Sequence, residues 1–350
     1  MDGLTPASRI AVGSLPLLDP AGAVRTQLLA FPEIPAWPQL PQKTSKEKMG
    51  LQGLCGFPGI HWVTQGQPIW NVPPAKRREL AEELIQDLKD DRLERAAFKP
   101  EEASGFYSFM NEASKPFGNK MLAVKGQVAG PLTLGTLLKD ESDRPLLSSR
   151  AGMEILKTYL MMHARWQARE LAKLGRPVVM FLDEPILGVS FKPENFGLDW
   201  LQVKKWISEI LLDLQERDIV TGLHCCGPQP WHWIFDTPAE MVHLDSFQFM
   251  DQIPGNADKL KTFLRRGGIL VWGMVPTQMT RGMFPEPAEL LNRLLDLMDT
   301  LVQMGVKKDD LVNRSFFSTS CGLGNSPLAT TEAAFRCLGE LVSLWKATVL

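Results

Sequence analysis

The stretch Ile219-Val-Thr-Gly-Leu-His224-Cys225-Cys226-Gly227 decides how the rest of the sequence is interpreted. Its apolar, β-branched beginning predicts a buried strand, and this strand ends in one imidazole and two thiols. Side chains alternate between the two faces of a strand, so His224 and Cys226 are expected on one face and Cys225 on the other. Imidazole and thiolate together favour zinc, with further ligands supplied from elsewhere in the chain. A single His-x-Cys pair is also typical of a histidine and thiols packed in a core.

Composition indicates a soluble globular protein and excludes several classes of partner. The chain has 350 residues, of which 44% are hydrophobic and 22% charged, and its net charge is −2. A balance without excess basic charge predicts no nucleic-acid partner, and apolar runs such as 177–182 are too short to span a membrane. Five cysteines, two of them adjacent, do not resemble a disulfide framework, and residues 1–6 lack the pattern of a signal peptide. We therefore expect a cytoplasmic protein, compatible with a homo-oligomer.

Eight strand-like segments, each followed by helical sequence, predict an α/β fold with one (β/α)8 TIM barrel over residues 1–350. The strands are expected at 9–16, 59–64, 122–128, 178–183, 219–225, 241–247, 269–275 and 315–321. The helices are expected at 20–29, 74–95, 100–114, 132–138, 147–174, 198–217, 257–266, 287–304 and 330–345.

Two irregular regions interrupt this pattern near the N-terminus. Four prolines in residues 31–41 are expected to prevent regular structure there, which predicts an extended N-terminal excursion from the barrel. A long loop is expected after the second strand. An open doubly wound sheet is the alternative fold, but the Gly-x-Gly-x-x-Gly turn of a dinucleotide-binding domain is missing.

Reactive residues fall at the carboxyl ends of several predicted strands, where barrel enzymes carry their chemistry. The ends in question hold Gly13-Ser14, Asp183-Glu184, His224 to Cys226, Asp245 and Cys321. Cys321 would supply the second thiolate that a zinc site formed by His224 and Cys226 requires. The structural alternatives are that Asp183-Glu184 caps the next helix, that Asp245 satisfies loop amides, and that Cys321 packs as a small core residue.

With these residues in place, the chain resembles the superfamily of cobalamin-independent methionine synthase, uroporphyrinogen decarboxylase and the corrinoid-linked methyltransferases. The likeness is closest to the catalytic, C-terminal barrel of cobalamin-independent methionine synthase, and it covers nearly the whole chain. The matching stretches are Val12-Gly-Ser-Leu-Pro16, Val124-Lys-Gly-Gln-Val-Ala-Gly-Pro-Leu-Thr133, Phe181-Leu-Asp-Glu-Pro185, His224-Cys-Cys226, Val242-His-Leu-Asp245 and Ser320-Cys-Gly-Leu323. The paired cysteines argue against uroporphyrinogen decarboxylase activity.

The resemblance implies roles for the residues at the strand ends. Zinc would be held by His224, Cys226 and Cys321, with Asp245 as a fourth ligand where methionine synthases carry glutamate. Gly13 and Ser14 would contact the carboxylate of an amino-acid substrate. Asp183 would hold the substrate amino group, with Glu184 beside it, and Asp183 and Asp245 would be the catalytic carboxylates.

The implied activity is a zinc-dependent methyl transfer to a thiol, with homocysteine as acceptor and methionine as product. Full-length enzymes use an additional N-terminal barrel to bind folate, which these 350 residues do not accommodate, so the expected donor is a methylated corrinoid, free or protein-bound. Two alternatives stay open. One is transfer to coenzyme M or another thiol, and the other is a non-catalytic zinc or corrinoid carrier.

Tryptophans near the predicted strand ends offer a way to bind such a donor. The chain contains ten tryptophans but two tyrosines. Those near the strand ends are expected to form an apolar surface for a flat macrocycle, or else to pack under loops: Trp37, Trp62, Trp70, Trp231 and Trp233.

Overall fold

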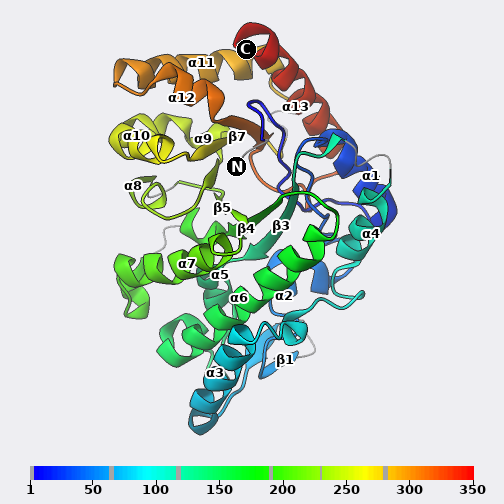
Figure 1. Cartoon of the computed structure of the whole chain (residues 1–350), viewed down its shortest axis with the longest axis vertical. Coiled ribbons are helices and arrows are strands. Elements are labelled where there is room, and N and C mark those ends of the chain that lie inside the picture. Colours follow the sequence, from blue (N-terminus) through cyan, green and yellow to red (C-terminus); the bar gives the residue numbers. More distant parts are fainter. Residues whose placement is uncertain (1–3, 63–66, 116–119, 189–191, 229–230, 279–282) are drawn as a thin grey trace.

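A six-stranded parallel sheet forms the centre of the computed structural model, which describes residues 4–62, 67–115, 120–188, 192–228, 231–278 and 283–350 (Figure 1). The strands follow one another in chain order, each paired with the next: β3 (Val124–Ala129), β4 (Val178–Asp183), β5 (Val220–Cys225), β6 (Met241–Leu244), β7 (Ile269–Val275) and β8 (Ser315–Thr319). All six begin within three residues of the predicted positions, and β4 and β7 have the predicted bounds. The α/β class is confirmed, and the sheet is compatible with a TIM-barrel-like fold.

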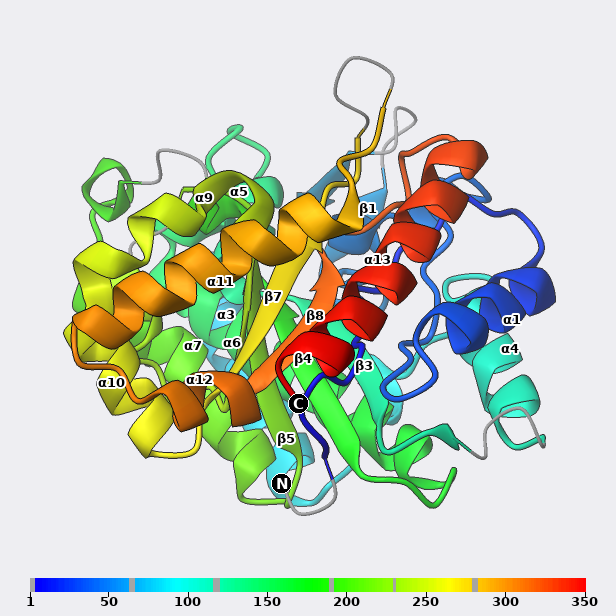
Figure 2. The same cartoon turned by 90° about the horizontal axis from the view of Figure 1, so that it is seen from above.

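Helices surround the sheet. Each predicted helix has a counterpart, and four short helices were not predicted: Met49–Gln52, Trp231–Ile234, Ser246–Phe249 and Lys308–Asn313. After β3 the connecting helices are α5 (Pro131–Leu137), α6 (Arg150–Ala172), α7 (Trp200–Gln215), α8 (Trp231–Ile234), α9 (Ser246–Phe249), α10 (Ala257–Arg265), α11 (Pro287–Gln303), α12 (Lys308–Asn313) and α13 (Leu328–Thr348). Before β3 they are α1 (Pro20–Ala30), α2 (Met49–Gln52), α3 (Pro74–Lys89) and α4 (Ser104–Ala113). Helix α13 packs on β7 and β8, with α11 beside it (Figure 2). None of the helices in these described ranges is long and apolar enough to cross a membrane.

The prediction of a second barrel strand at 59–64 is wrong. Residues Ile60–Trp62 form β1, which pairs antiparallel with β2 (Pro68–Trp70) in a separate two-stranded sheet. Residues 63 and 64 lie outside the described part of the chain. This small sheet lies against α3, where the Arg77 guanidinium stacks over the Trp70 ring.

The proline-rich segment 31–41 occupies the place expected of the second strand. Ile34 forms a parallel bridge with Ile10, and Ala36 forms one with Lys125 of β3. Its prolines are tolerated because the amides that bond to neighbouring segments belong to other residues, Ile34, Trp37 and Gln39. The expectation that prolines prevent regular structure here is confirmed, because the segment forms only isolated bridges, but it packs beside β3 instead of leaving the sheet.

The first predicted strand is an extended segment held by isolated bridges. Arg9 pairs in parallel with Phe317 of β8, and Ser14 pairs with Gln39. Single bridges thus connect β8 to the segment 9–14, this segment to 34–39, and 34–39 to β3. Regular strands occur at six of the eight predicted positions, segment 9–14 contributes only isolated bridges, and position 59–64 belongs to the separate two-stranded sheet, so the described residues do not form a closed eight-stranded barrel.

An apolar cluster fills the space between the strands and forms the floor beneath their carboxyl ends. It contains buried side chains from both N-terminal segments and from β4, β6, β7 and β8: Ile10, Ile34, Val179, Phe181, Met241, Ile269, Val271 and Phe316, together with Ala123 just before β3. Val179 and Phe181 belong to this cluster, whereas Met180 and Leu182 pack in the outer core with the helices. This division follows the alternation of side chains along a strand.

The packing of segment 31–41 can be tested with a helical glycine. A Cβ atom on Gly105 of α4 would lie 1.8 Å from the carbonyl oxygen of Pro38, so Gly105→Ala must displace the segment. We expect it to lower the free energy of unfolding by about 1–3 kcal/mol in urea denaturation.

Gly339 of α13 is the matched control, because the nearest heavy atom to its added Cβ lies 3.9 Å away. Gly339→Ala should raise the free energy of unfolding by about 0.5–1 kcal/mol, the ordinary helical preference for alanine. Equal stabilisation by both substitutions would show that segment 31–41 does not lie against α4.

Candidate metal centre

Three predicted ligand residues come together at the carboxyl ends of β5 and β8. His224 lies in β5, Cys226 follows β5 directly, and Cys321 follows β8. Their ligand atoms all lie within 4.8 Å of one another, and Cys321 Sγ is 3.9 Å from His224 Nε2. His224 is buried, and the two cysteines are half-buried. The structure therefore forms a compact group of one imidazole and two thiols from residues nearly 100 positions apart.

Strand alternation produces this group, as the sequence predicts. Cys225 points away from His224 and Cys226, and its Sγ donates to the carbonyl oxygen of Glu184 at 2.9 Å. Cys225 is thus a buried core thiol. Cys55 and Cys337 are also buried, away from this group.

The protonation chemistry of the three residues suits zinc. Burial, with help from His243 and Lys125, holds the pKa of His224 well below its usual range, so the imidazole is neutral and keeps a lone pair for a metal. The hydrogen bond between the two thiols lowers the pKa of Cys321 and raises that of Cys226. Two thiols that share a proton in this way can release it when a cation binds. Nitrogen and sulfur donors of this kind fit zinc, and His224, Cys226 and Cys321 are the residues that would hold it.

Asp245 does not belong to the group of three in the structure. Its Oδ1 accepts a hydrogen bond from the Gln248 amide at 3.1 Å, and its Oδ2 accepts one from Gln248 Nε2 at 2.9 Å. Burial raises the pKa of Asp245 to about 6, and the bonds from Gln248 oppose that shift. Asp245 therefore caps α9, which is the alternative that the sequence left open. Its roles as metal ligand and catalytic residue stay predictions.

Asp183 lies at the end of β4, beside His224 in the parallel register of β4 and β5. Its side chain is 2% exposed, and Oδ1 has no hydrogen-bond partner among the described residues. Burial raises the pKa of Asp183 to about 7, and the Lys125 ammonium opposes this shift. A buried carboxylate oxygen without a partner is a feature that a substrate donor would satisfy.

Glu184 points in a different direction from Asp183 and is fully buried. Its carboxylate accepts hydrogen bonds from the amides of Leu132 and Thr133, both at 2.9 Å, and from the Thr133 hydroxyl at 2.6 Å. These bonds hold the N-terminal turn of α5. Glu184 thus caps a helix that precedes it in the chain, not the next helix as the structural alternative had it, and its predicted contact with a substrate gains no support.

Gly13 and Ser14 lie beside the loop that carries Cys321. The Ser14 carbonyl accepts from the Leu323 amide at 3.0 Å, and its hydroxyl accepts from the Gly324 amide at 3.3 Å. Gly13 has a φ of 140°, and an added Cβ would come within 2.9 Å of Gln127 Nε2, so only glycine fits here. The predicted substrate-binding residues therefore adjoin the candidate metal centre.

Two residues of this region were not singled out from the sequence. Lys125 of β3 is 2% exposed, and its Nζ donates to the Val12 carbonyl at 2.8 Å. Burial lowers the pKa of Lys125 to about 8, although Asp183 opposes this shift. His243 is buried, and its ring centroid lies 4.4 Å from that of His224. Lys125 could have been noticed in the sequence, because it is a charged residue inside an otherwise uncharged, strand-like run.

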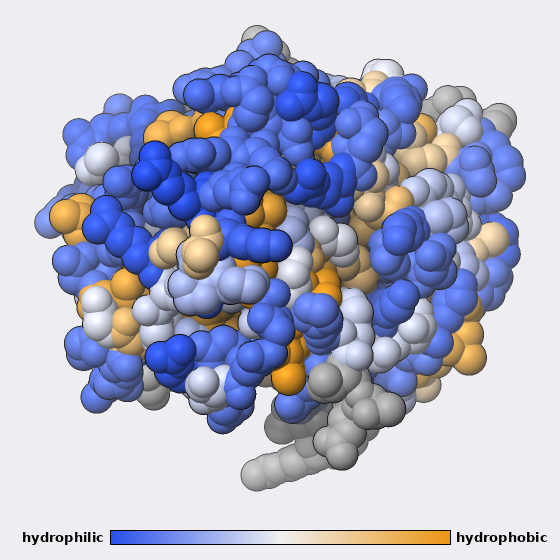
Figure 3. Space-filling view, turned by 90° about the horizontal axis from the view of Figure 1, so that it is seen from below, coloured by the Kyte–Doolittle hydropathy of each residue, from blue (hydrophilic) through white to orange (hydrophobic). Residues whose placement is uncertain are grey.

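The predicted tryptophan surface is not present. The rings of Trp37, Trp70, Trp231 and Trp233 are all buried, and Trp62 is 40% exposed. Trp37 instead donates to Gln167 Oε1 at 3.0 Å inside the core. The face shown in Figure 3 is mostly hydrophilic, with hydrophobic residues in small groups. The packing alternative therefore holds for four of the five tryptophans.

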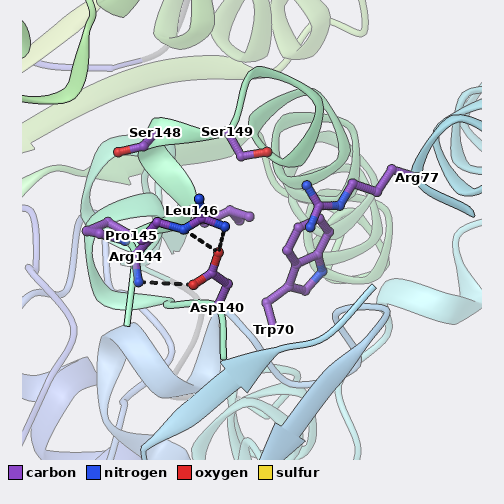
Figure 4. Close-up of a pocket in the computed structure, with 8 residues that line it drawn as sticks. All are labelled: Trp70, Arg77, Asp140, Arg144, Pro145, Leu146, Ser148 and Ser149. Atoms are coloured by element: carbon purple, nitrogen blue, oxygen red, sulfur yellow. Dashed lines mark hydrogen bonds and ion pairs between the residues drawn. The ribbon is translucent and has the colours of Figure 1, made fainter. Parts of the chain in front are cut away.

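A separate pocket of about 220 Å³ lies between β2 and the start of α6 (Figure 4). It shares no lining residue with the candidate metal centre. Arg144 binds the Asp140 carboxylate, and the Arg77 guanidinium lies 4.7 Å from the centroid of the Trp70 ring. Arg144 is paired with Asp140, and the Arg77 guanidinium adds a positive charge that no other acidic residue of the lining balances.

Metal analysis of serine variants tests the group of three residues. Wild-type protein reconstituted with zinc should hold about one ion per chain, and Cys226→Ser or Cys321→Ser should lose it because each removes a sulfur donor. Cys225→Ser is the matched control and should keep the ion, since its thiol faces Glu184. Elemental analysis after dialysis measures the content.

Circular dichroism of the same variants should show an intact fold, because the chain has its own large apolar core. Zinc loss from Cys225→Ser with retention by Cys226→Ser would contradict the assignment.

Comparisons with known proteins add information about the fold. No protein family model matches the chain, and no curated protein matches its sequence. Among solved structures, the chain is similar to a B12-independent methionine synthase from Shewanella sp. W3-18-1, determined in complex with selenomethionine. The TM-score is 0.58 at 13% sequence identity, and the match covers 98% of each chain. At this identity the likeness shows the fold alone, and it places this chain with an α/β protein of the same length and architecture.

Proposed function

We propose that this chain is a zinc-dependent methyltransferase that moves a methyl group to a thiol, with homocysteine as acceptor and methionine as product. The observation that carries the proposal is the group of His224, Cys226 and Cys321, whose ligand atoms lie within 4.8 Å of one another at the strand ends. The similarity of fold to a B12-independent methionine synthase supports the same reaction class. In this proposal the two N-terminal segments complete an eight-membered barrel around the site.

The chemistry of thiols explains why a metal is needed. A free alkyl thiol has a pKa above neutrality, so little of it is the reactive thiolate at pH 7. Zinc held by His224, Cys226 and Cys321 would lower the pKa of a substrate thiol and so supply the nucleophile. In the transfer, the sulfur–methyl bond forms while the donor–methyl bond breaks, and the donor keeps the electron pair of that bond.

The protein residues orient the acceptor in this proposal. Asp183 presents a buried oxygen without a partner, which can accept a hydrogen bond from a substrate ammonium. Gly13 and Ser14 lie beside the Cys321 loop, where they can hold the carboxylate of the same molecule. An amino-acid thiol would therefore be bound through both its ammonium and its carboxylate. Glu184 acts indirectly, because it fixes α5 next to the end of β4.

The donor in this proposal is a methylated corrinoid, as the resemblance implies. The similarity of fold to a B12-independent methionine synthase favours another donor, so methyltetrahydrofolate is the second candidate. Transfer to a sulfonate thiol such as coenzyme M is disfavoured, because the Asp183 carboxylate would repel the sulfonate. A non-catalytic carrier would bind zinc and thiol without turnover.

The activity test uses zinc-reconstituted protein without oxygen. Homocysteine is supplied with methylcobalamin or with methyltetrahydrofolate, and methionine is measured by mass spectrometry. We expect methionine from methylcobalamin. Turnover with methyltetrahydrofolate alone would assign the folate donor, and absence of product from every donor and thiol would contradict a methyltransferase.

Asp183→Asn tests the orientation of the acceptor. Loss of the charge should raise the KM for homocysteine by about tenfold or more, because a charge-assisted hydrogen bond to the ammonium is removed. The KM for 3-mercaptopropionate, which has no ammonium, should change by less than about twofold, and the zinc content should stay that of the parent. An unchanged KM for homocysteine would remove Asp183 from the acceptor site.

A further inference from the structure

We propose that Lys125 is a positioning residue for the acceptor: it fixes the peptide between Val12 and Gly13, and through this peptide it orients the segment that holds the substrate carboxylate. The inference rests on the proposed function, since it assigns a determinant of specificity within the same site. Nothing in the proposed chemistry requires Lys125 to touch the reacting atoms.

The placement of Lys125 is unusual for a lysine. Its side chain is 2% exposed and lies between the strands, with Nζ 4.8 Å from the centroid of the Phe181 ring. Nζ donates to the Val12 carbonyl at 2.8 Å and to Gln127 Oε1 at 3.3 Å. Burial of an ammonium is costly unless it is hydrogen-bonded, and both bonds of this ammonium are directed toward the Val12–Gly13 region.

The two contacts fix one short piece of backbone from both sides. Lys125 holds the carbonyl of Val12, and Gln127 packs where a Cβ atom of Gly13 would lie. Because a peptide unit is planar, holding its carbonyl also fixes the direction of the Gly13 amide. Lys125 and Gln127 are two residues apart on β3, so both face inward from one strand. The backbone of the segment is therefore oriented by a rigid element.

Gly13 and Ser14 have amides available for a ligand. Within the described part of the chain, neither amide donates a hydrogen bond to another backbone or side-chain group, whereas the neighbouring Leu15 amide donates to the Gln39 carbonyl. Two successive free amides beside the Cys321 loop are suited to a carboxylate. Movement of the Val12–Gly13 peptide would misdirect the first of them.

The side chain of Lys125 is not needed to hold its own strand. The Lys125 amide donates to the Pro35 carbonyl at 2.9 Å, and the Lys125 carbonyl accepts from the Trp37 amide at 3.3 Å. The residue also lies in the parallel ladder between β3 and β4. Replacing the ammonium by an apolar group of similar length should therefore leave the sheet in place.

Lys125→Met is the test variant, and Arg266→Met is the matched control. Arg266 also donates to backbone carbonyls, with its Nη2 3.2 Å from the Ala239 carbonyl, but it contacts no residue of the candidate site. In zinc-reconstituted Lys125→Met, we expect the KM for homocysteine to rise by about tenfold or more, with kcat within about threefold of the parent. The KM for 2-mercaptoethanol should change by less than about twofold, because this thiol has neither carboxylate nor ammonium.

Two further measurements do not depend on turnover. Hydrogen exchange should become faster in the peptide that covers residues 10–17 of Lys125→Met and stay unchanged there in Arg266→Met. Calorimetry should show weaker homocysteine binding to Lys125→Met at parental zinc content. If Lys125→Met does not fold, Lys125→Gln is measured in the same way.

The results separate this inference from the proposed function. Unchanged exchange and unchanged homocysteine binding in Lys125→Met would overturn the inference, as would loss of zinc or an equal rise in KM for both thiols. If the parent forms no methionine, the proposed function fails, while exchange and calorimetry still decide whether Lys125 orients the segment 12–14.

Discussion

The parallel pairing of β4 with β5 is the constraint on which the candidate site depends. In this register Asp183 lies beside His224, and side-chain alternation then puts Cys226 on the same face as His224. The third ligand residue, Cys321, follows β8, and its Sγ lies 3.9 Å from His224 Nε2. An imidazole, two thiols and a carboxylate thus converge without a long loop of their own. The site is as rigid as the strands that carry it.

Burial of charge in this region is balanced by specific partners. Glu184 is satisfied by the first turn of α5, and Lys125 is satisfied by the Val12 carbonyl and Gln127. Asp183 is different, because one of its oxygens has no partner in the described part of the chain. Since the other buried charges near the site have partners, this oxygen is the point at which a ligand would gain most. The asymmetry between Asp183 and Glu184, adjacent in sequence, follows from the opposite directions of successive side chains.

Apolar runs and side-chain alternation in the sequence predicted much of this structure. They did not predict features that depend on which distant segment a residue packs against. The bounds of β4 and β7 and the convergence of His224, Cys226 and Cys321 follow from apolar runs and strand alternation. Segment 31–41 has no regular strand, as its prolines predict, but its place beside β3 was not foreseen, because its bridge partners lie 24 to 89 residues away in the chain. Burial of Trp231 and Trp233 likewise depends on tertiary packing rather than on composition. Lys125 was visible as a charged residue within a strand, but its carbonyl partner is 113 residues away.

The central claim is that one imidazole and two thiolates of this chain bind zinc. X-ray absorption at the zinc edge of the reconstituted protein tests it most directly, because sulfur and nitrogen neighbours give distinct scattering. We expect two sulfur neighbours at about 2.3 Å and at least one imidazole nitrogen at about 2.0 Å. A zinc spectrum with only oxygen and nitrogen neighbours would contradict it.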